Sequence, residues 1–233
     1  MRRWLSAERL GAAGRHTLDA AERQAAWAAS AALLEYPSDE VLAALPQVRT
    51  LVEELPELVA EPLLRVVGTL EAAEPEALRT EYVERFDHAR RRSLFLTYFV
   101  HGDTRRRGLA LLRFKQAYAA AGLSFGDDEL PDHLCVVLQF GALHDHDAAW
   151  KLLLDHRAGV ELLRLAARET SWGGVLEAVS ASLPPLRGEE SEAVARLMAE
   201  GPPAEEVGLQ PYLIDPQIPV GPPPGSHLIG ANR

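Results

Sequence analysis

The chain has 233 residues, of which 47% are hydrophobic, and its formal net charge is −10. This length and apolar content suffice for one domain with a buried core and are too small for two large domains. The negative charge disfavours binding to nucleic acid phosphates and to anionic membrane surfaces. Composition alone therefore favours a cationic protein or peptide as partner.

Signals for membrane insertion or secretion are missing from the sequence. No apolar run reaches the length of about 18 residues that a membrane-spanning helix needs. The first residues, MRRWLSAERLGAAGRHT, contain arginines but no continuous apolar core of the secretory type. We therefore expect a cytoplasmic protein. The only cysteine, Cys135, lies among apolar neighbours and is predicted to be a packed, unreactive thiol.

Apolar residues recur three and four positions apart, which predicts an all-α protein, and strand-like alternation is missing. A first helix is expected from Thr17 to Tyr36, ending there because Pro37 disfavours a helical predecessor. Ser38 is expected to cap a short second helix. The inward face of the first helix is predicted to hold Trp27, Ala31 and Leu34.

The middle of the chain continues the helical pattern. An apolar stripe begins at Pro62, and Pro75 suits the first position of a further helix. The segment from Leu94 to Val100 has no polar face, so it is either a buried helix or a hydrophobic wall that a partner covers. The predicted inward residues are Leu63, Val66, Val67 and Leu70 in the stripe, then Leu78, Tyr82 and Phe86 in the next helix.

The later helices are predicted from their caps and stripes. Asp103 is expected to cap a helix that ends at Gly122, and another starts at Leu130-Pro131-Asp132. Two more are expected at 147–168 and 171–183, followed by an amphipathic turn with Val194, Leu197 and Met198. These patterns predict three parts: a flexible N-terminal segment (1–16), a single-domain helical bundle (17–200) and a Pro/Gly-rich tail (201–233).

Few residues suggest catalysis or metal binding. The run His144-Asp145-His146-Asp147 has metal-binding side chains, but sequence neighbours point in different directions on a helix, and Asp147 suits an N-cap. At another helix entrance, Asp132 is expected to interact with the exposed amides and His133 to bridge to a loop. No activated nucleophile or phosphate-binding loop is recognisable. We therefore predict a non-enzyme without cofactor or bound metal.

The arginine run Arg105, Arg106 and Arg107 occupies the first turn of a predicted helix, where the helix dipole disfavours cations. Ion pairing with Asp103 and with Glu81 or Glu84 is the preferred explanation. A bound anion, such as a cofactor phosphate or a partner carboxylate, is the alternative.

A set of short motifs between Glu81 and Phe140 resembles one known family. The motifs are Tyr82, Phe86-Asp87, Arg92-Ser93-Leu94, His101-Gly102, Arg107-Gly108, Tyr118, Gly122-Leu123 and Glu129-Leu130-Pro131-Asp132-His133-Leu134, with Leu34-Glu35-Tyr36-Pro37 near the front. Together they resemble the NarJ-type assembly chaperones of respiratory nitrate reductase, often called its delta subunit. These are related to the TorD-like redox enzyme maturation chaperones.

The resemblance implies an all-helical cytoplasmic chaperone and not an enzyme. Such a protein binds the N-terminal segment of the apo catalytic (alpha) subunit of nitrate reductase and supports molybdenum cofactor insertion before membrane docking. It also implies contact with the cofactor-insertion machinery. A basic, amphipathic client segment would fit a groove between helices that has an acidic rim.

Carried over residue by residue, the resemblance places client binding at five positions and a hinge or motif role at nine. The client-binding residues are Tyr82, Phe86, Leu94, His101 and Tyr118, of which Tyr82 and Phe86 also suit a core. The hinge and motif residues are Asp87, Arg92, Ser93, Gly102, Asp103, Arg107, Pro131, Asp132 and His133. Two alternatives stay open: a sibling chaperone for another molybdenum oxidoreductase, and a small metal-dependent enzyme using His133, His144 and His146.

Overall fold

The computed structural model describes residues 17–87, 94–102, 105–124, 126, 130–186 and 188–200. Within these ranges the chain is helical, and the only β-type pairing is an isolated antiparallel bridge between Phe95 and His133. The all-α prediction is thus confirmed. The helices are α1 (Ala20–Leu34), α2 (Asp39–Ala43), α3 (Leu45–Glu53), α4 (Glu57–Ala72), α5 (Pro75–Tyr82), η2 (Val83–Asp87), α6 (Leu96–His101), α7 (Arg105–Ala120), α8 (Leu134–Leu143), α9 (His146–Asp155), α10 (Arg157–Ala167), α11 (Gly173–Ala181) and α12 (Glu189–Glu200).

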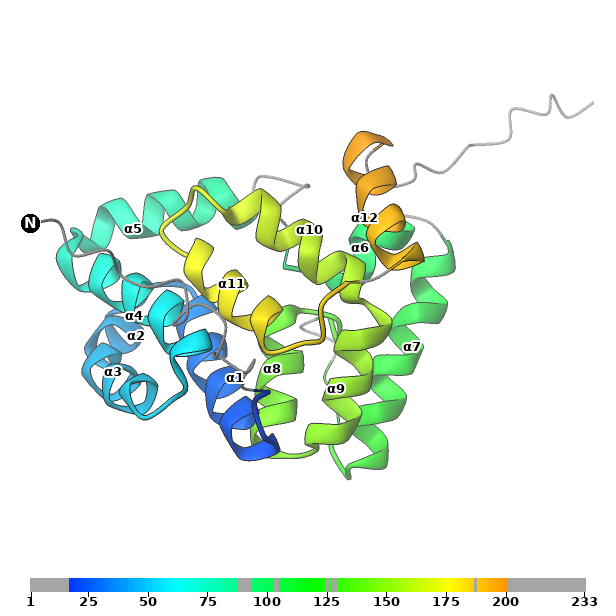
Figure 1. Ribbon diagram of the computed structural model, residues 1–233, viewed down its shortest axis with the longest axis horizontal. Coiled ribbons are helices and arrows are strands. Elements are labelled where there is room, and N and C mark those ends of the chain that lie inside the picture. Colours follow the sequence, from blue (N-terminus) through cyan, green and yellow to red (C-terminus); the bar gives the residue numbers. More distant parts are fainter. Residues whose placement is uncertain are drawn as a thin grey trace, which may run out of the picture.

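Helices α1, α4, α8 and α11 form the centre of the bundle (Figure 1). Helix α1 packs against α8 and α11, and α4 packs against α11, while α10 contacts α6, α11 and α12. Two glycines allow the closest approaches: a Cβ on Gly141 of α8 would lie 2.6 Å from the Trp27 ring, and one on Gly174 of α11 would lie 2.3 Å from the Pro62 carbonyl oxygen. The fully buried side chains include Trp27, Leu33, Leu34, Leu63, Phe114, Leu138, Leu153 and Trp172.

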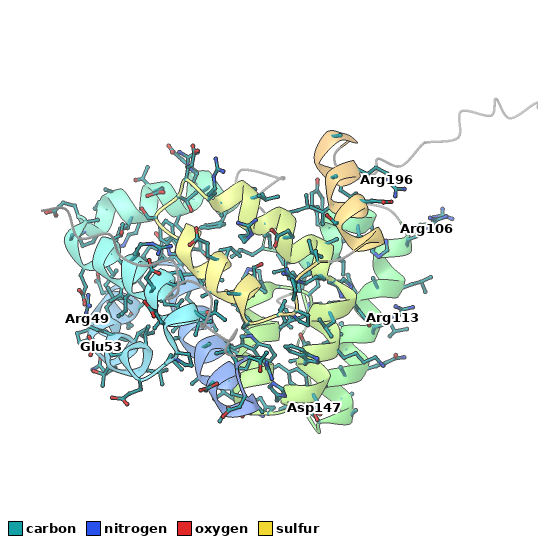
Figure 2. All side chains as sticks on the ribbon, in the orientation of Figure 1. Arg49, Glu53, Arg106, Arg113, Asp147 and Arg196 are labelled. Carbon is teal, nitrogen blue, oxygen red and sulfur yellow. The ribbon has the colours of Figure 1, made fainter. Side chains whose placement is uncertain are left out.

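Helix α7 lies at the right edge of the bundle in Figure 1 and covers it with one face only. Its buried residues, Ala110, Phe114 and Tyr118, follow one another at four-residue spacing. The opposite face exposes Leu109 together with basic residues, and Figure 2 shows Arg106 and Arg113 pointing away from the bundle. This face of α7 therefore presents Leu109 and basic side chains to the solvent.

Several local predictions are confirmed. Ser38 caps α2 by accepting a hydrogen bond from the Val41 amide, and Pro75 is the first residue of α5. Gly122 follows α7 with φ of 79°, a left-handed conformation that glycine adopts without steric cost. Cys135 is buried. Local sequence patterns thus identified these helix ends correctly.

The bounds of the first helix differ from the prediction at both ends. Asp19 caps α1 in a capping box with Glu22, so the helix starts at Ala20 and not at Thr17. It ends at Leu34, two residues before the expected Tyr36.

The predicted helix at 147–168 is two helices. Asp145, not Asp147, caps α9 by accepting from the Ala148 amide. The helix then breaks at His156, whose backbone leaves the helical region and whose Nδ1 is 2.9 Å from the Leu152 carbonyl oxygen. The His156 ring packs against Phe114 with centroids 4.8 Å apart, so a long-range contact accompanies a break that periodicity did not predict.

Of the two predictions for the segment that begins at Leu94, the structure supports the buried helix. It forms the short helix α6, and Leu94, Leu96 and Thr97 are buried. No helix of the described ranges combines the length and apolar character needed to cross a bilayer. The proposed N-terminal segment (1–16) and tail (201–233) lie outside the described residues.

Candidate functional site

The family motifs around Leu94 and Asp132 meet at one place, which we call the junction: residues 94–97 and 131–134 with Arg107 and Tyr118. Two backbone hydrogen bonds join its segments, from the Leu96 amide to the Asp132 carbonyl at 3.1 Å and from the Leu134 amide to the Leu94 carbonyl at 2.8 Å. The rings of Phe95 and His133 lie 5.1 Å apart. The start of α8 is thereby joined to the start of α6.

A buried carboxylate holds the junction together. Asp132 has no exposed surface, and its Oδ2 accepts hydrogen bonds from the Thr97 amide at 3.0 Å and the Thr97 hydroxyl at 2.6 Å. The expected interaction of Asp132 with the amides of its own helix is wrong, because α8 starts two residues later with no side-chain cap. The carboxylate instead stabilises a long-range contact.

Arg107 is a cation close to this carboxylate. Its Nη2 lies 3.9 Å from Asp132 Oδ2, its Nε donates to the Thr97 hydroxyl at 3.2 Å, and its guanidinium lies over the Phe95 and Tyr98 rings. Glu81 was an expected partner of the arginine run, but its carboxylate accepts from the Ser171 amide and hydroxyl. Of the three arginines from Arg105 to Arg107, Arg107 is therefore the one that lies in the junction.

Tyr118 closes the junction from α7. Its hydroxyl donates to the Pro131 carbonyl at 2.6 Å, and its ring packs against Phe140 with centroids 4.8 Å apart. Both contacts are buried. Tyr118 therefore fixes the loop before α8.

Tyr82 and Phe86 lie in a separate aromatic cluster with Trp172. The Tyr82 ring is 5.0 Å from Phe86 and 5.3 Å from Trp172, and its hydroxyl donates to the Leu34 carbonyl at 2.8 Å. The π-helical turn η2 continues α5 and keeps both aromatic side chains buried. They have the contacts of core residues.

The predicted client-binding and hinge residues are therefore distributed over the junction, the aromatic cluster and the end of α6, apart from those that lie outside the described residues. Tyr82, Phe86, Leu94 and Tyr118 are buried, so a client could reach them only after helices separate. His101 is half-buried, and burial, followed by the neighbouring His156, lowers its pKa. Gly102 ends α6 with φ of 56°. Asp87 ends η2, and Arg92, Ser93 and Asp103 lie outside the described residues.

A groove of about 1420 Å³ opens elsewhere in the molecule, between the start of α1, the α3–α4 connection, one side of α10 and the end of α11, with Trp150 of α9 in its lining. Small-molecule sites usually have volumes of roughly 300–1,000 Å³, so this volume suits a peptide better. The lining residues are Thr17, Leu18, Glu22, Arg23, Glu54, Leu55, Pro56, Glu57, Leu58, Trp150, Arg157, Glu161, Arg164, Ser180, Ala181, Ser182, Leu183, Pro184, Pro185 and Leu186.

A buried polar network forms one wall of this groove. Arg157 donates to Glu161 at 3.3 Å, to the Ser180 hydroxyl at 3.0 Å and to the Pro184 carbonyl at 3.3 Å. Glu161 also accepts from Ser180 at 2.9 Å and from Arg164 Nε at 2.7 Å. Burial tends to raise the pKa of Glu161, but the hydrogen bonds from Arg164 and Ser180 outweigh it and lower that pKa. The network ties α10 to the end of α11.

The edges of the groove combine apolar and acidic groups. Leu58 is 48% exposed, and two exposed carboxylates lie near it in the chain, Glu54 at the end of α3 and Glu57 at the start of α4. Across the groove, the Arg23 guanidinium lies 4.3 Å from the centroid of the Trp150 ring. Apolar surface with unburied carboxylates at one edge is suited to an apolar segment that carries positive charge.

Sequence reasoning predicted a client groove with an acidic rim but did not place it here, because the lining of this groove comes from five separated parts of the chain. The one local signal is the run Leu183-Pro184-Pro185-Leu186, which is apolar and cannot continue a helix. The other lining residues become neighbours only through packing.

The three histidines of the metal hypothesis have different surroundings. His133 packs against Phe95, His144 stacks on Phe140, and His146 stacks on Trp27 with centroids 5.2 Å apart. Among the described residues, no three His, Cys, Asp or Glu side chains are grouped closely enough to hold a metal ion. The described structure therefore gives that hypothesis no support.

The fold matches a solved structure from Archaeoglobus fulgidus, named as a candidate redox enzyme maturation protein. The TM-score is 0.52 at 23% sequence identity, and the match covers 67% of this chain and 91% of that one. The helical arrangement is thus one already known, which places the chain in a class of all-α proteins with this topology.

The sequence comparisons identify the family. Residues 46–173 match the family described as nitrate reductase delta subunit. NarJ of Bacillus subtilis is 32% identical over 177 residues, covering 75% of this chain and 96% of that protein. The nitrate reductase molybdenum cofactor assembly chaperone NarJ of Escherichia coli K12 is 34% identical over 122 residues, about half of each chain. The chain belongs to the nitrate reductase delta subunit family.

Proposed function

We propose that this protein is an assembly chaperone of respiratory nitrate reductase. In this proposal it binds the N-terminal segment of the apo catalytic subunit in the cytoplasm and supports molybdenum cofactor insertion before the complex docks at the membrane. Family membership supports the chaperone role, because its relatives include a protein named as a molybdenum cofactor assembly chaperone of nitrate reductase. The partner implied by that family is a nitrate reductase.

The observation that carries the proposal is the groove of about 1420 Å³. A chaperone of this kind recognises a peptide segment, which requires a surface larger than a small-molecule pocket. Leu55, Leu58 and Leu183 offer apolar contacts, and Glu54 and Glu57 offer negative charge to a basic client. We therefore place the client segment in the groove, with its cationic residues toward Glu54 and Glu57.

The test is calorimetric titration with the N-terminal peptide of the catalytic subunit encoded beside this chain, at two salt concentrations. Saturable binding in roughly the micromolar range that weakens with salt is expected. The double substitution Glu54→Lys/Glu57→Lys should weaken binding, by about tenfold where no other segment of the chain competes for the groove. Leu109→Asp on α7 is the matched control, because Leu109 is 70% exposed and lies outside the groove.

Two other results would redirect the proposal. Normal binding by the groove variant, with weakened binding by a His101 variant, would return the client site to the motif residues predicted from sequence. Binding only to N-terminal peptides of other molybdenum oxidoreductases would identify a sibling chaperone. No binding of either kind of peptide contradicts the proposed client recognition.

A further inference from the structure

We infer that the chain carries its own competitor for the groove: residues 1–16 bind there as an intramolecular pseudo-client and reduce access for other peptides. This inference concerns the regulation of the proposed client site and, in that part, rests on the proposed function. The docking of residues 1–16 is a separate physical claim that can be tested with no client present.

The first argument is connectivity. Thr17 and Leu18 both line the groove, and Leu18 is 5% exposed and belongs to the hydrophobic core cluster. The preceding 16 residues are therefore attached at the groove itself. A helix of that length spans about 24 Å, and an extended chain spans more, so the segment has the reach to cover the lining residues.

The second argument is chemical complementarity. Residues 1–16 read MRRWLSAERLGAAGRH, with four arginines against one glutamate and with Trp4, Leu5 and Leu10 as apolar residues. The groove supplies the matching groups, because Leu55, Leu58, Leu183 and Leu186 are apolar and Glu54 and Glu57 are exposed carboxylates. Arg157 and Arg164 share Glu161 as their ion-pair partner in the wall, so one of their two charges is balanced there. Over the whole lining, four glutamates outnumber three arginines. A basic segment with apolar side chains is the chemistry that this surface favours.

The third argument is effective concentration. A segment joined to its site by a short connection experiences a local concentration in the millimolar range, so even weak intrinsic affinity gives high occupancy. If residues 1–16 occupy the groove about 90% of the time, the apparent affinity of an external peptide falls about tenfold. Competition of this kind keeps the groove closed to weak partners and lets a tighter client displace the segment.

Proximity can be tested with a bimane label, whose fluorescence is quenched when a tryptophan touches it. The label is attached to the full-length chain carrying Leu58→Cys, because Leu58 lines the groove and is 48% exposed. Cys135 is 5% exposed, and labelling of the unsubstituted chain measures any reaction there. Adding Trp4→Phe removes the quencher from the N-terminal segment and preserves an apolar side chain.

Emission from the label at position 58 should rise at least about twofold with Trp4→Phe, and Glu54→Lys/Glu57→Lys should produce a similar rise by releasing the segment. The matched control carries the label through Leu109→Cys on α7, where Trp4→Phe should change nothing. Equal emission with and without Trp4 at position 58 overturns the inference. Loss of quenching over about a hundredfold dilution also overturns it, because the segment would then come from a second copy.

The regulatory part has its own measurement. Arg2→Glu/Arg3→Glu, which leaves every groove residue unchanged, should tighten client-peptide binding about fivefold by removing the competitor. Unchanged affinity contradicts the regulation even where the label shows docking. A chain that docks its own segment and binds no client peptide would retain the inferred contact and contradict only the proposed function.

Discussion

The junction and the groove show two different uses of polar groups. In the junction, Asp132 is fully buried and its carboxylate accepts two hydrogen bonds from Thr97. In the groove, Glu54 and Glu57 are exposed at the edge. Removing a buried, hydrogen-bonded charge mainly costs stability, whereas removing an exposed charge mainly changes encounter and binding. The junction is therefore expected to maintain the fold and the groove to recognise a partner.

The largest effect on stability is expected from Asp132→Ala, which tests the structural role of the junction. It leaves the buried amide and hydroxyl of Thr97 without their acceptor and should lower the free energy of unfolding by about 3 kcal/mol. Urea denaturation followed by circular dichroism measures the loss. Asp132→Asn is the matched control, because its amide oxygen can still accept from Thr97, and it should cost less. A loss below about 0.5 kcal/mol for the alanine variant would remove the structural role assigned to the junction.

Replacing Arg157 in the groove wall should lower the free energy of unfolding nearly as much. Replacing Arg157 by Met preserves much of its length but removes the donors to Glu161, Ser180 and Pro184, so about 2 kcal/mol of stability should be lost. Arg65→Met is the control, because Arg65 makes exposed ion pairs with Glu61 and Glu177 and should change stability by less than about 0.5 kcal/mol. Thermal unfolding of both variants compares the two positions directly.

Acidification should weaken the contacts between α7, α9 and α10 through His156. Burial is the main cause that lowers the pKa of this histidine, so the fold favours its neutral form. The unfolded chain binds the proton at about pH 6.5, and stability should therefore be complete above that pH and fall as the pH drops below it. His156→Asn should flatten the stability profile below about pH 6.5. An unchanged profile would place the acid sensitivity elsewhere, for example at His101.

A smaller effect is expected at Tyr118. Tyr118→Phe removes one hydrogen bond, to the Pro131 carbonyl, while the ring keeps its packing against Phe140. The expected loss is about 1 kcal/mol, with client binding unchanged. A selective loss of client binding at constant stability would instead support the direct binding role that the family resemblance predicts for Tyr118.

The smallest stability change is expected from Glu54→Lys/Glu57→Lys. Both side chains are exposed, so unfolding should shift by less than about 0.5 kcal/mol. Binding of a basic peptide should nevertheless weaken, and its dependence on salt should decrease. Substitution of Glu54 and Glu57 should therefore change binding and leave stability nearly unchanged, whereas substitution of Asp132 should mainly change stability.

The sequence by itself determined the helical class, several helix ends and the family. Ser38, Pro75 and Gly122 act through their own backbone and nearest neighbours, so their roles could be predicted locally. The motifs from Tyr82 to Leu134 supported the resemblance that the family match then confirmed. These features depend on residues close together in the chain.

Tertiary structure decided the partner of Asp132, the break at His156 and the lining of the groove. Asp132 and Thr97 are 35 residues apart, and the groove joins the start of α1 to the end of α11. Periodicity predicts which face of a helix turns inward but not which distant residue it meets. The junction residues were therefore recognisable as motifs before their contacts were known, whereas the groove exists only once the helices have packed.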